Sequence, residues 1–121
     1  MSNEKILVVD DSPTMRNMLS YALKSGGYEV VTAKDGEEAL KMLDSQSVAL
    51  ILLDVIMPKL NGFQVCRKIK SSLQHKGIKI IMLTSKNLEF DAFWGKKQGA
   101  DLYISKPFEI KSLLSNIASL I

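Results

Sequence analysis

Short apolar runs alternate along this chain with longer segments of mixed polarity. The runs are rich in Ile, Val and Leu, and they predict strands at about residues 5–10, 29–33, 48–54, 79–83 and 101–105. Continuous apolar runs of this kind are typical of parallel strands that are buried on both faces of a sheet. The segments between the runs have the length of helices. The pattern therefore predicts that strand and helix alternate five times.

Helix-capping and helix-breaking residues mark where the expected helices begin and end. Ser12 suits the N-cap position and Pro13 the first helical position, and Gly26-Gly27 ends this helix after about Lys24. Similar signals predict the other helices at about residues 36–44, 61–74, 88–98 and 109–121. The connections are short, so right-handed crossovers are expected. The predicted fold class is α/β, a three-layer α/β/α domain with a five-stranded parallel sheet.

Length and composition narrow the class of protein. A chain of 121 residues has the size of one domain, so we expect residues 1–121 to form a single unit. The net charge is only +3 and the cations are scattered, so direct nucleic-acid binding is not expected. The N-terminus lacks a signal-peptide pattern, and no apolar stretch approaches the ~20 residues needed for membrane insertion. Cys66 is the only cysteine, and we expect it to be buried and inert in a reducing, cytoplasmic protein.

Four of the expected strands run directly into polar residues. Asp10 and Asp11 follow the first strand, Asp54 ends the third, Thr84 follows the fourth, and Lys106 comes just after the fifth. In a parallel sheet the carboxyl ends of all strands lie at one edge, where ligands bind. We therefore expect three carboxylates, a hydroxyl and an ammonium to meet at one rim of the sheet.

Three converging carboxylates need a counter-charge. Two unit charges about 4 Å apart repel by about 4 kcal/mol at an effective dielectric constant near 20. Either a proton or a bound cation must relieve that repulsion. Oxygen ligands with room for water suit Mg²⁺. Transition metals are disfavoured because His75 is the only histidine and no thiolate accompanies the acids. The sequence therefore predicts a Mg²⁺ site.

The hydroxyl and the ammonium suggest what else binds at this rim. Thr84 and Lys106 suit a tetrahedral dianion, since one donates a hydrogen bond and the other neutralises charge. A carboxylate can itself accept a phosphoryl group and form an aspartyl phosphate, with Mg²⁺ screening the phosphoryl oxygens. Asp54 is the expected acceptor, because it ends a central strand with the other two acids across from it.

These residues lie in motifs that are jointly specific. The motifs are Val8-Val9-Asp10-Asp11-Ser12, Leu53-Asp54-Val55-Ile56-Met57-Pro58 with Asn61-Gly62, Leu83-Thr84-Ser85, Gly99-Ala100-Asp101 and Lys106-Pro107-Phe108. With them the whole chain resembles the receiver domain of two-component response regulators. It is also similar to the single-domain regulators of chemotaxis and twitching motility. The resemblance implies a flavodoxin-like strand order, 2-1-3-4-5.

The resemblance also implies a role for each residue of the rim. Asp54 would accept the phosphoryl group from a histidine kinase or a histidine phosphotransfer protein. Asp10 and Asp11 would hold Mg²⁺, with Asp11 and Asp54 as direct ligands beside the backbone carbonyl of Ile56. Thr84 would contact the phosphoryl oxygens.

Further implications concern the residues around the fifth strand. Lys106 would also contact the phosphoryl oxygens, and its bond to Pro107 would be cis. Thr84 and Tyr103 would form the switch that changes the face of the fourth helix, fifth strand and fifth helix. Through that face the protein would bind an unidentified downstream protein, as a monomer or as a phosphorylation-dependent dimer. Members of the family would act as signalling switches rather than as turnover enzymes. The chain would be either a stand-alone regulator or a receiver domain excised from a longer protein.

Three other interpretations compete with this one. A metal-dependent phosphatase of the haloacid dehalogenase type would place its two acids two residues apart, whereas Asp10 and Asp11 are adjacent. A flavodoxin-like flavin binder would need a hydroxyl- and glycine-rich loop after the first strand, whereas Asp10-Asp11 stand there and would repel the flavin phosphate unless a metal intervened. A degenerate receiver that acts only as a binding module would lack part of the acidic, hydroxyl and ammonium set, which is complete here.

Overall fold

The structure is a computed structural model, and it describes residues 4–55, 57, 60–84 and 99–121. Strands and helices alternate in the order β1 (Lys5–Val9), α1 (Pro13–Ser25), β2 (Glu29–Ala33), α2 (Gly36–Ser45), β3 (Leu50–Asp54), α3 (Gly62–Lys70), β4 (Lys79–Thr84), β5 (Leu102–Ser105) and α5 (Ile110–Leu120). The helix expected at 88–98 lies outside the described residues.

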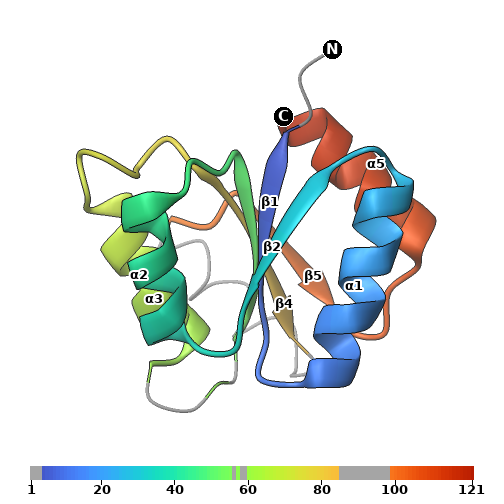
Figure 1. Ribbon diagram of the computed structural model, residues 1–121, viewed down its shortest axis with the longest axis horizontal. Coiled ribbons are helices and arrows are strands. Elements are labelled where there is room, and N and C mark those ends of the chain that lie inside the picture. Colours follow the sequence, from blue (N-terminus) through green and yellow to red (C-terminus); the bar gives the residue numbers. More distant parts are fainter. Residues whose placement is uncertain (1–3, 56, 58–59, 85–98) are drawn as a thin grey trace.

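All five strands form one parallel sheet in the order β2-β1-β3-β4-β5. Helices α1 and α5 cover one face of the sheet and α2 and α3 cover the other (Figure 1). The order reverses at β1, whose two neighbours are β2 and β3, so β1 and β3 lie side by side at the centre. The three-layer architecture and the strand order expected from the resemblance are both confirmed.

Each face of the sheet has its own hydrophobic core. Along β3, Leu50 and Leu52 pack on the side of α1 and α5, whereas Ile51 and Leu53 pack on the side of α2 and α3. All four are fully buried. Because side chains alternate along a strand, a continuous apolar run supplies both cores at once. Asp54 breaks that run at the point where the strand reaches the rim.

The predicted end of the third helix is wrong. We expected it to reach residue 74, but α3 ends at Lys70 and turns follow. The Lys70 ammonium donates to the carbonyl of Ile78 at 2.9 Å and contacts Asp101 at 3.0 Å. The same Asp101 carboxylate accepts the backbone N–H of Ile80 at 2.8 Å. One lysine thereby holds the returning chain to the starts of β4 and β5, which a longer helix would prevent.

The start of α1 agrees with the prediction. The Ser12 hydroxyl accepts the backbone N–H of Met15 at 3.2 Å, and Pro13 opens the helix. No helix within the described ranges is long and apolar enough to cross a membrane.

Candidate functional site

Three acidic residues meet where the two central strands end. Asp10 follows β1, Asp11 is next along the chain, and Asp54 is the last residue of β3. Each offers one carboxylate oxygen, and the three oxygens lie within 4.8 Å of one another. Asp10 is 2% exposed and Asp54 9%, while Asp11 is exposed. The parallel sheet thus brings together the cluster that the sequence predicted.

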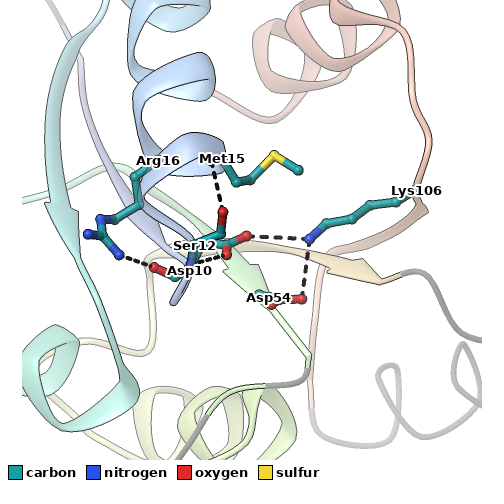
Figure 2. Close-up of polar contacts among 6 residues, drawn as sticks. All are labelled: Asp10, Ser12, Met15, Arg16, Asp54 and Lys106. Carbon is teal, nitrogen blue, oxygen red and sulfur yellow. Dashed lines mark hydrogen bonds and ion pairs between the residues drawn. The ribbon is translucent and has the colours of Figure 1, made fainter.

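Lys106 places its ammonium between two of these acids (Figure 2). Its Nζ lies 3.4 Å from Asp10 Oδ2 and 3.5 Å from Asp54 Oδ1. The backbone N–H of Lys106 donates to the carbonyl of Thr84 at 2.6 Å, which joins the loop after β5 to the end of β4. The Lys106–Pro107 peptide bond is cis, as the resemblance implied. The ammonium therefore supplies part of the counter-charge that the cluster needs.

Asp10 is bound on both carboxylate oxygens. Its Oδ1 accepts the backbone N–H of Ser12 at 2.9 Å, while Oδ2 faces Lys106. Its position is therefore set by the loop into α1 as well as by the lysine. Asp54 shares the same lysine, and its side chain is somewhat more exposed, at 12% compared with 3% for Asp10.

Gly62 brings the start of α3 against the backbone of Asp54. Its N–H donates to the carbonyl of Val55 at 2.8 Å. A Cβ at this position would overlap the Asp54 carbonyl oxygen and lie 2.8 Å from Val55 Cα. Asn61 and Gln64 form a reciprocal capping box just before it, a signal that the sequence carries as Asn-x-x-Gln. Close packing of this helix start requires a residue without a side chain.

Thr84 and Tyr103 lie on the same side of the sheet. Thr84 ends β4 and pairs with Ser105, and Tyr103 pairs with Met82 two residues earlier on each strand. Paired residues in parallel strands share a face, as do residues two apart. Thr84 is buried, and Tyr103 is partly buried against the core beneath α2 and α3. The geometry puts the hydroxyl and the aromatic ring of the expected switch on one face of adjacent strands.

Cys66 takes no part in this site. It is fully buried in α3, and this burial is the main reason why the pKa of its thiol is raised to about 11. The positive charge of Lys70 lowers that pKa, and the negative charge of Asp101 raises it. The thiol is therefore protonated at neutral pH, which agrees with the expectation of an inert cysteine.

Most of the residues singled out by the sequence do converge. Asp10, Asp11, Asp54 and Lys106 form one cluster, with Thr84 joined to it through the backbone of Lys106. The backbone carbonyl expected from Ile56 lies outside the described residues. The donors present are carboxylate oxygens at a partly exposed rim, which is the ligand chemistry that Mg²⁺ prefers.

Replacing Lys106 by Met should destabilise the metal-free protein. The change leaves three carboxylates close together without their ammonium, so we expect the free energy of unfolding in EDTA to fall by about 1–3 kcal/mol. Millimolar Mg²⁺ should recover much of the loss, and so should adding Asp54→Asn. Chemical denaturation with and without Mg²⁺ measures both effects. An equal deficit in EDTA and Mg²⁺ would mean that Lys106 acts through packing rather than charge.

Comparison with known proteins identifies the family. The family model of the response regulator receiver domain matches residues 6–118. The chain belongs to this family. The receiver domain is 43% identical over 119 residues to the alkaline phosphatase synthesis transcriptional regulatory protein PhoP of Bacillus subtilis, covering 98% of this chain and 49% of that protein. It is 37% identical over 113 residues to protein PilH of Pseudomonas aeruginosa, covering 93% of each. The chain spans about half the length of PhoP and of several other curated relatives.

Solved structures of receiver proteins have the same fold. The chemotaxis protein CheY4 of Vibrio cholerae superimposes with a TM-score of 0.93 at 36% identity, covering 99% of this receiver domain and 100% of that chain. The response regulator TrrA of Thermotoga maritima, solved in complex with Mg(2+)-BeF, has a TM-score of 0.87 at 36% identity, with 98% and 99% coverage. The chain is thus the receiver domain of a two-component response regulator, and such regulators are a class of signalling switches.

Proposed function

We propose that this receiver domain, residues 1–121, is a phosphorylation-dependent switch in which Asp54 accepts a phosphoryl group in the presence of Mg²⁺. The observation that carries the proposal is the convergence of three carboxylate oxygens within 4.8 Å of one another, with the Lys106 ammonium between Asp10 and Asp54. We assign Asp54 as the acceptor because it ends β3 with the other two acids across from it, whereas Asp10 is held by both Ser12 and Lys106. Asp11 is left to bind the metal.

The proposed donor is a phosphohistidine on a histidine kinase or a histidine phosphotransfer protein. One carboxylate oxygen of Asp54 attacks the phosphorus, a new O–P bond forms, and the N–P bond of the donor breaks with its electron pair left on the imidazole nitrogen. Lys106 is already within 3.5 Å of the attacking carboxylate, so its ammonium can follow the developing charge. The Thr84 hydroxyl supplies the second contact to the phosphoryl oxygens.

The metal site we propose consists of Asp11 and Asp54 as direct ligands, with the backbone carbonyl of Ile56. Asp10 would support the site without binding the ion directly, because its oxygens are held by Ser12 and Lys106. Mg²⁺ bound there would screen the negative charge of the phosphoryl oxygens during transfer. The relative TrrA, whose structure contains Mg(2+)-BeF, supports this assignment by analogy.

The proposed output is a change in partner binding. When the Thr84 hydroxyl is drawn toward the phosphoryl group, space opens on the face that it shares with Tyr103, and the ring repositions. The equilibrium between two surface states then shifts along β5 and α5, together with the fourth predicted helix. The partner is a downstream protein in the cytoplasm rather than nucleic acid, and the switch works as a monomer or as a phosphorylation-dependent dimer.

Acetyl phosphate provides the direct test of phosphoryl transfer. Incubation with acetyl phosphate and Mg²⁺ should add one phosphoryl mass to the protein, in an alkali-labile form that is typical of acyl phosphates. Chelation with EDTA should suppress the labelling, because the clustered acids then repel the donor. Intact-mass spectrometry measures both results. If the protein binds Mg²⁺ but is never labelled, the domain is a degenerate receiver that acts as a binding module. Release of inorganic phosphate with steady turnover would instead favour a phosphatase.

A further inference from the structure

Every polar atom of Asp10 has a partner. Its backbone N–H donates to the carbonyl of Ala33 at 3.2 Å, and its carboxylate binds Ser12 and Lys106. Its backbone carbonyl accepts a hydrogen bond at 2.8 Å from Nη1 of Arg16, six positions further along the chain (Figure 2). The last contact is the one that neither the acidic cluster nor the strand pattern explains.

Arg16 reaches this carbonyl from the first turn of α1. Its backbone N–H donates to the carbonyl of Ser12 at 3.0 Å, as an ordinary helix bond. Its side chain then folds back past the helix start, and the guanidinium binds the peptide that joins Asp10 to Asp11. A peptide unit is planar, so holding its oxygen also fixes the direction in which the chain enters Asp11.

Asp11 depends on that backbone for its position. Among the described residues, none forms a hydrogen bond or ion pair with the Asp11 carboxylate, and the residue is exposed. Its oxygen nevertheless lies within 4.8 Å of those of Asp10 and Asp54. Lys106 holds the carboxylates of Asp10 and Asp54 in place. The position of the Asp11 carboxylate is set only by the conformation of the loop that carries it.

We propose that Arg16 is a positioning residue for the metal site, which sets the affinity for Mg²⁺ by holding the Asp10–Asp11 peptide. The inference rests on the proposed function, since that function assigns Asp11 as a metal ligand. With the peptide held, the Asp11 carboxylate is already near its place before the ion arrives. Without it, binding must also order the loop, and that cost appears as weaker affinity. Outer contacts that orient metal ligands are typically worth 10- to 100-fold in affinity.

The direction in which the Mg²⁺ affinity changes shows whether Arg16 acts by positioning Asp11 or through its charge. Arg16 is a cation near a cation site, so removing its charge alone should tighten the binding of Mg²⁺. Removing a positioning contact should loosen it. We expect Arg16→Met to raise the Mg²⁺ dissociation constant by roughly tenfold. Arg16→Lys keeps the charge but not the guanidinium geometry, and should fall between Arg16→Met and the unchanged protein.

The experiment is a Mg²⁺ titration of the whole chain, followed by calorimetry or by the amide NMR signals of Asp10 and Asp11. Lys24→Met is the matched control, because it removes an exposed cation from the last turn of the same helix. Its dissociation constant should stay within about twofold of the unchanged protein. Initial rates of phosphorylation by acetyl phosphate are measured over a range of Mg²⁺ concentrations. Arg16→Met should be slow at low Mg²⁺ and come within about threefold of the unchanged protein at saturation.

Several outcomes would overturn the inference. Unchanged or tighter Mg²⁺ binding by Arg16→Met would mean that the contact does not position Asp11. An equal loss of affinity in Lys24→Met would mean that the loss is not specific to the contact of Arg16 with Asp10. An equal loss of rate at low and saturating Mg²⁺ would point to a general structural defect. Failure of the unchanged protein to bind Mg²⁺ at all is a different result, because it would refute the proposed metal site itself.

Discussion

Replacing Asp54 by Asn is expected to abolish phosphorylation by acetyl phosphate, with labelling below about 1% of the unchanged protein. The amide oxygen carries no negative charge and is a poor nucleophile toward phosphorus. The neighbouring acids do not substitute for it. Both oxygens of Asp10 are held by Ser12 and Lys106, and Asp11 lies on the exposed side of the cluster. Intact-mass spectrometry after incubation with Mg²⁺ measures the result.

The matched control for this variant is Asp44→Asn. Asp44 lies in α2 with its side chain 77% exposed, away from the acidic cluster. This variant makes the same chemical change, so it should be labelled like the unchanged protein. Asp54→Asn should also remain folded, since it removes one of three clustered negative charges. Labelling of the Asn variant at the level of the control would place the acceptor on another residue.

Gly62→Ala is expected to have the largest effect on stability. A Cβ here would overlap the carbonyl oxygen of Asp54 and lie 3.1 Å from its carbonyl carbon, so the atoms in the way are backbone atoms at the end of β3, where the proposed acceptor lies. Backbone atoms cannot turn aside as a flexible side chain can. We expect the free energy of unfolding to fall by about 3 kcal/mol, at the upper end for overpacking. Displacement of Asp54 should also slow phosphorylation at least about tenfold.

Gly77→Ala is the control for this glycine. In the part of the chain that the structure describes, no heavy atom beyond Gly77 and its two neighbours lies within 4 Å of a Cβ built at this position. Its backbone is not in the left-handed region. Its free energy of unfolding should therefore stay within about 1 kcal/mol of the unchanged protein. Denaturation curves and phosphorylation rates of both variants provide the comparison. Similar stabilities for the two variants would mean that the start of α3 can shift without affecting Asp54.

Much of the candidate site could be predicted from the sequence because its residues follow strand ends. Asp10, Asp54 and Thr84 each come directly at or after a run of apolar residues, and parallel strands bring such positions to one edge. That inference needs only the strand pattern and the common direction of the strands. The role of Lys106 followed from its charge and its place after the fifth strand, and the structure places its ammonium within 3.5 Å of two acids. The family resemblance supplied the role of Tyr103.

Other features depend on contacts between residues far apart in the chain. The helix ending at Lys70 could not be placed from local pattern, since residues 71–74 contain no strong helix breaker. The turn is stabilised by the bonds of Lys70 to Ile78 and Asp101, and Asp101 lies 31 positions away. Local propensity is a weak constraint that such long-range contacts readily override.

The sequence by itself therefore determined the sheet, its two cores and the identity of the acids at its rim. These follow from periodicity and from the chemistry of the side chains, which are local properties. Tertiary structure alone decided which groups hold each of those acids in place. The Asp10 carboxylate is held by Ser12 and Lys106, and its carbonyl by Arg16. The start of α3 at Gly62 packs closely against the backbone of Asp54. These distinctions rest on distances of a few ångströms between separate elements, and no pattern of residue types along the chain encodes such distances.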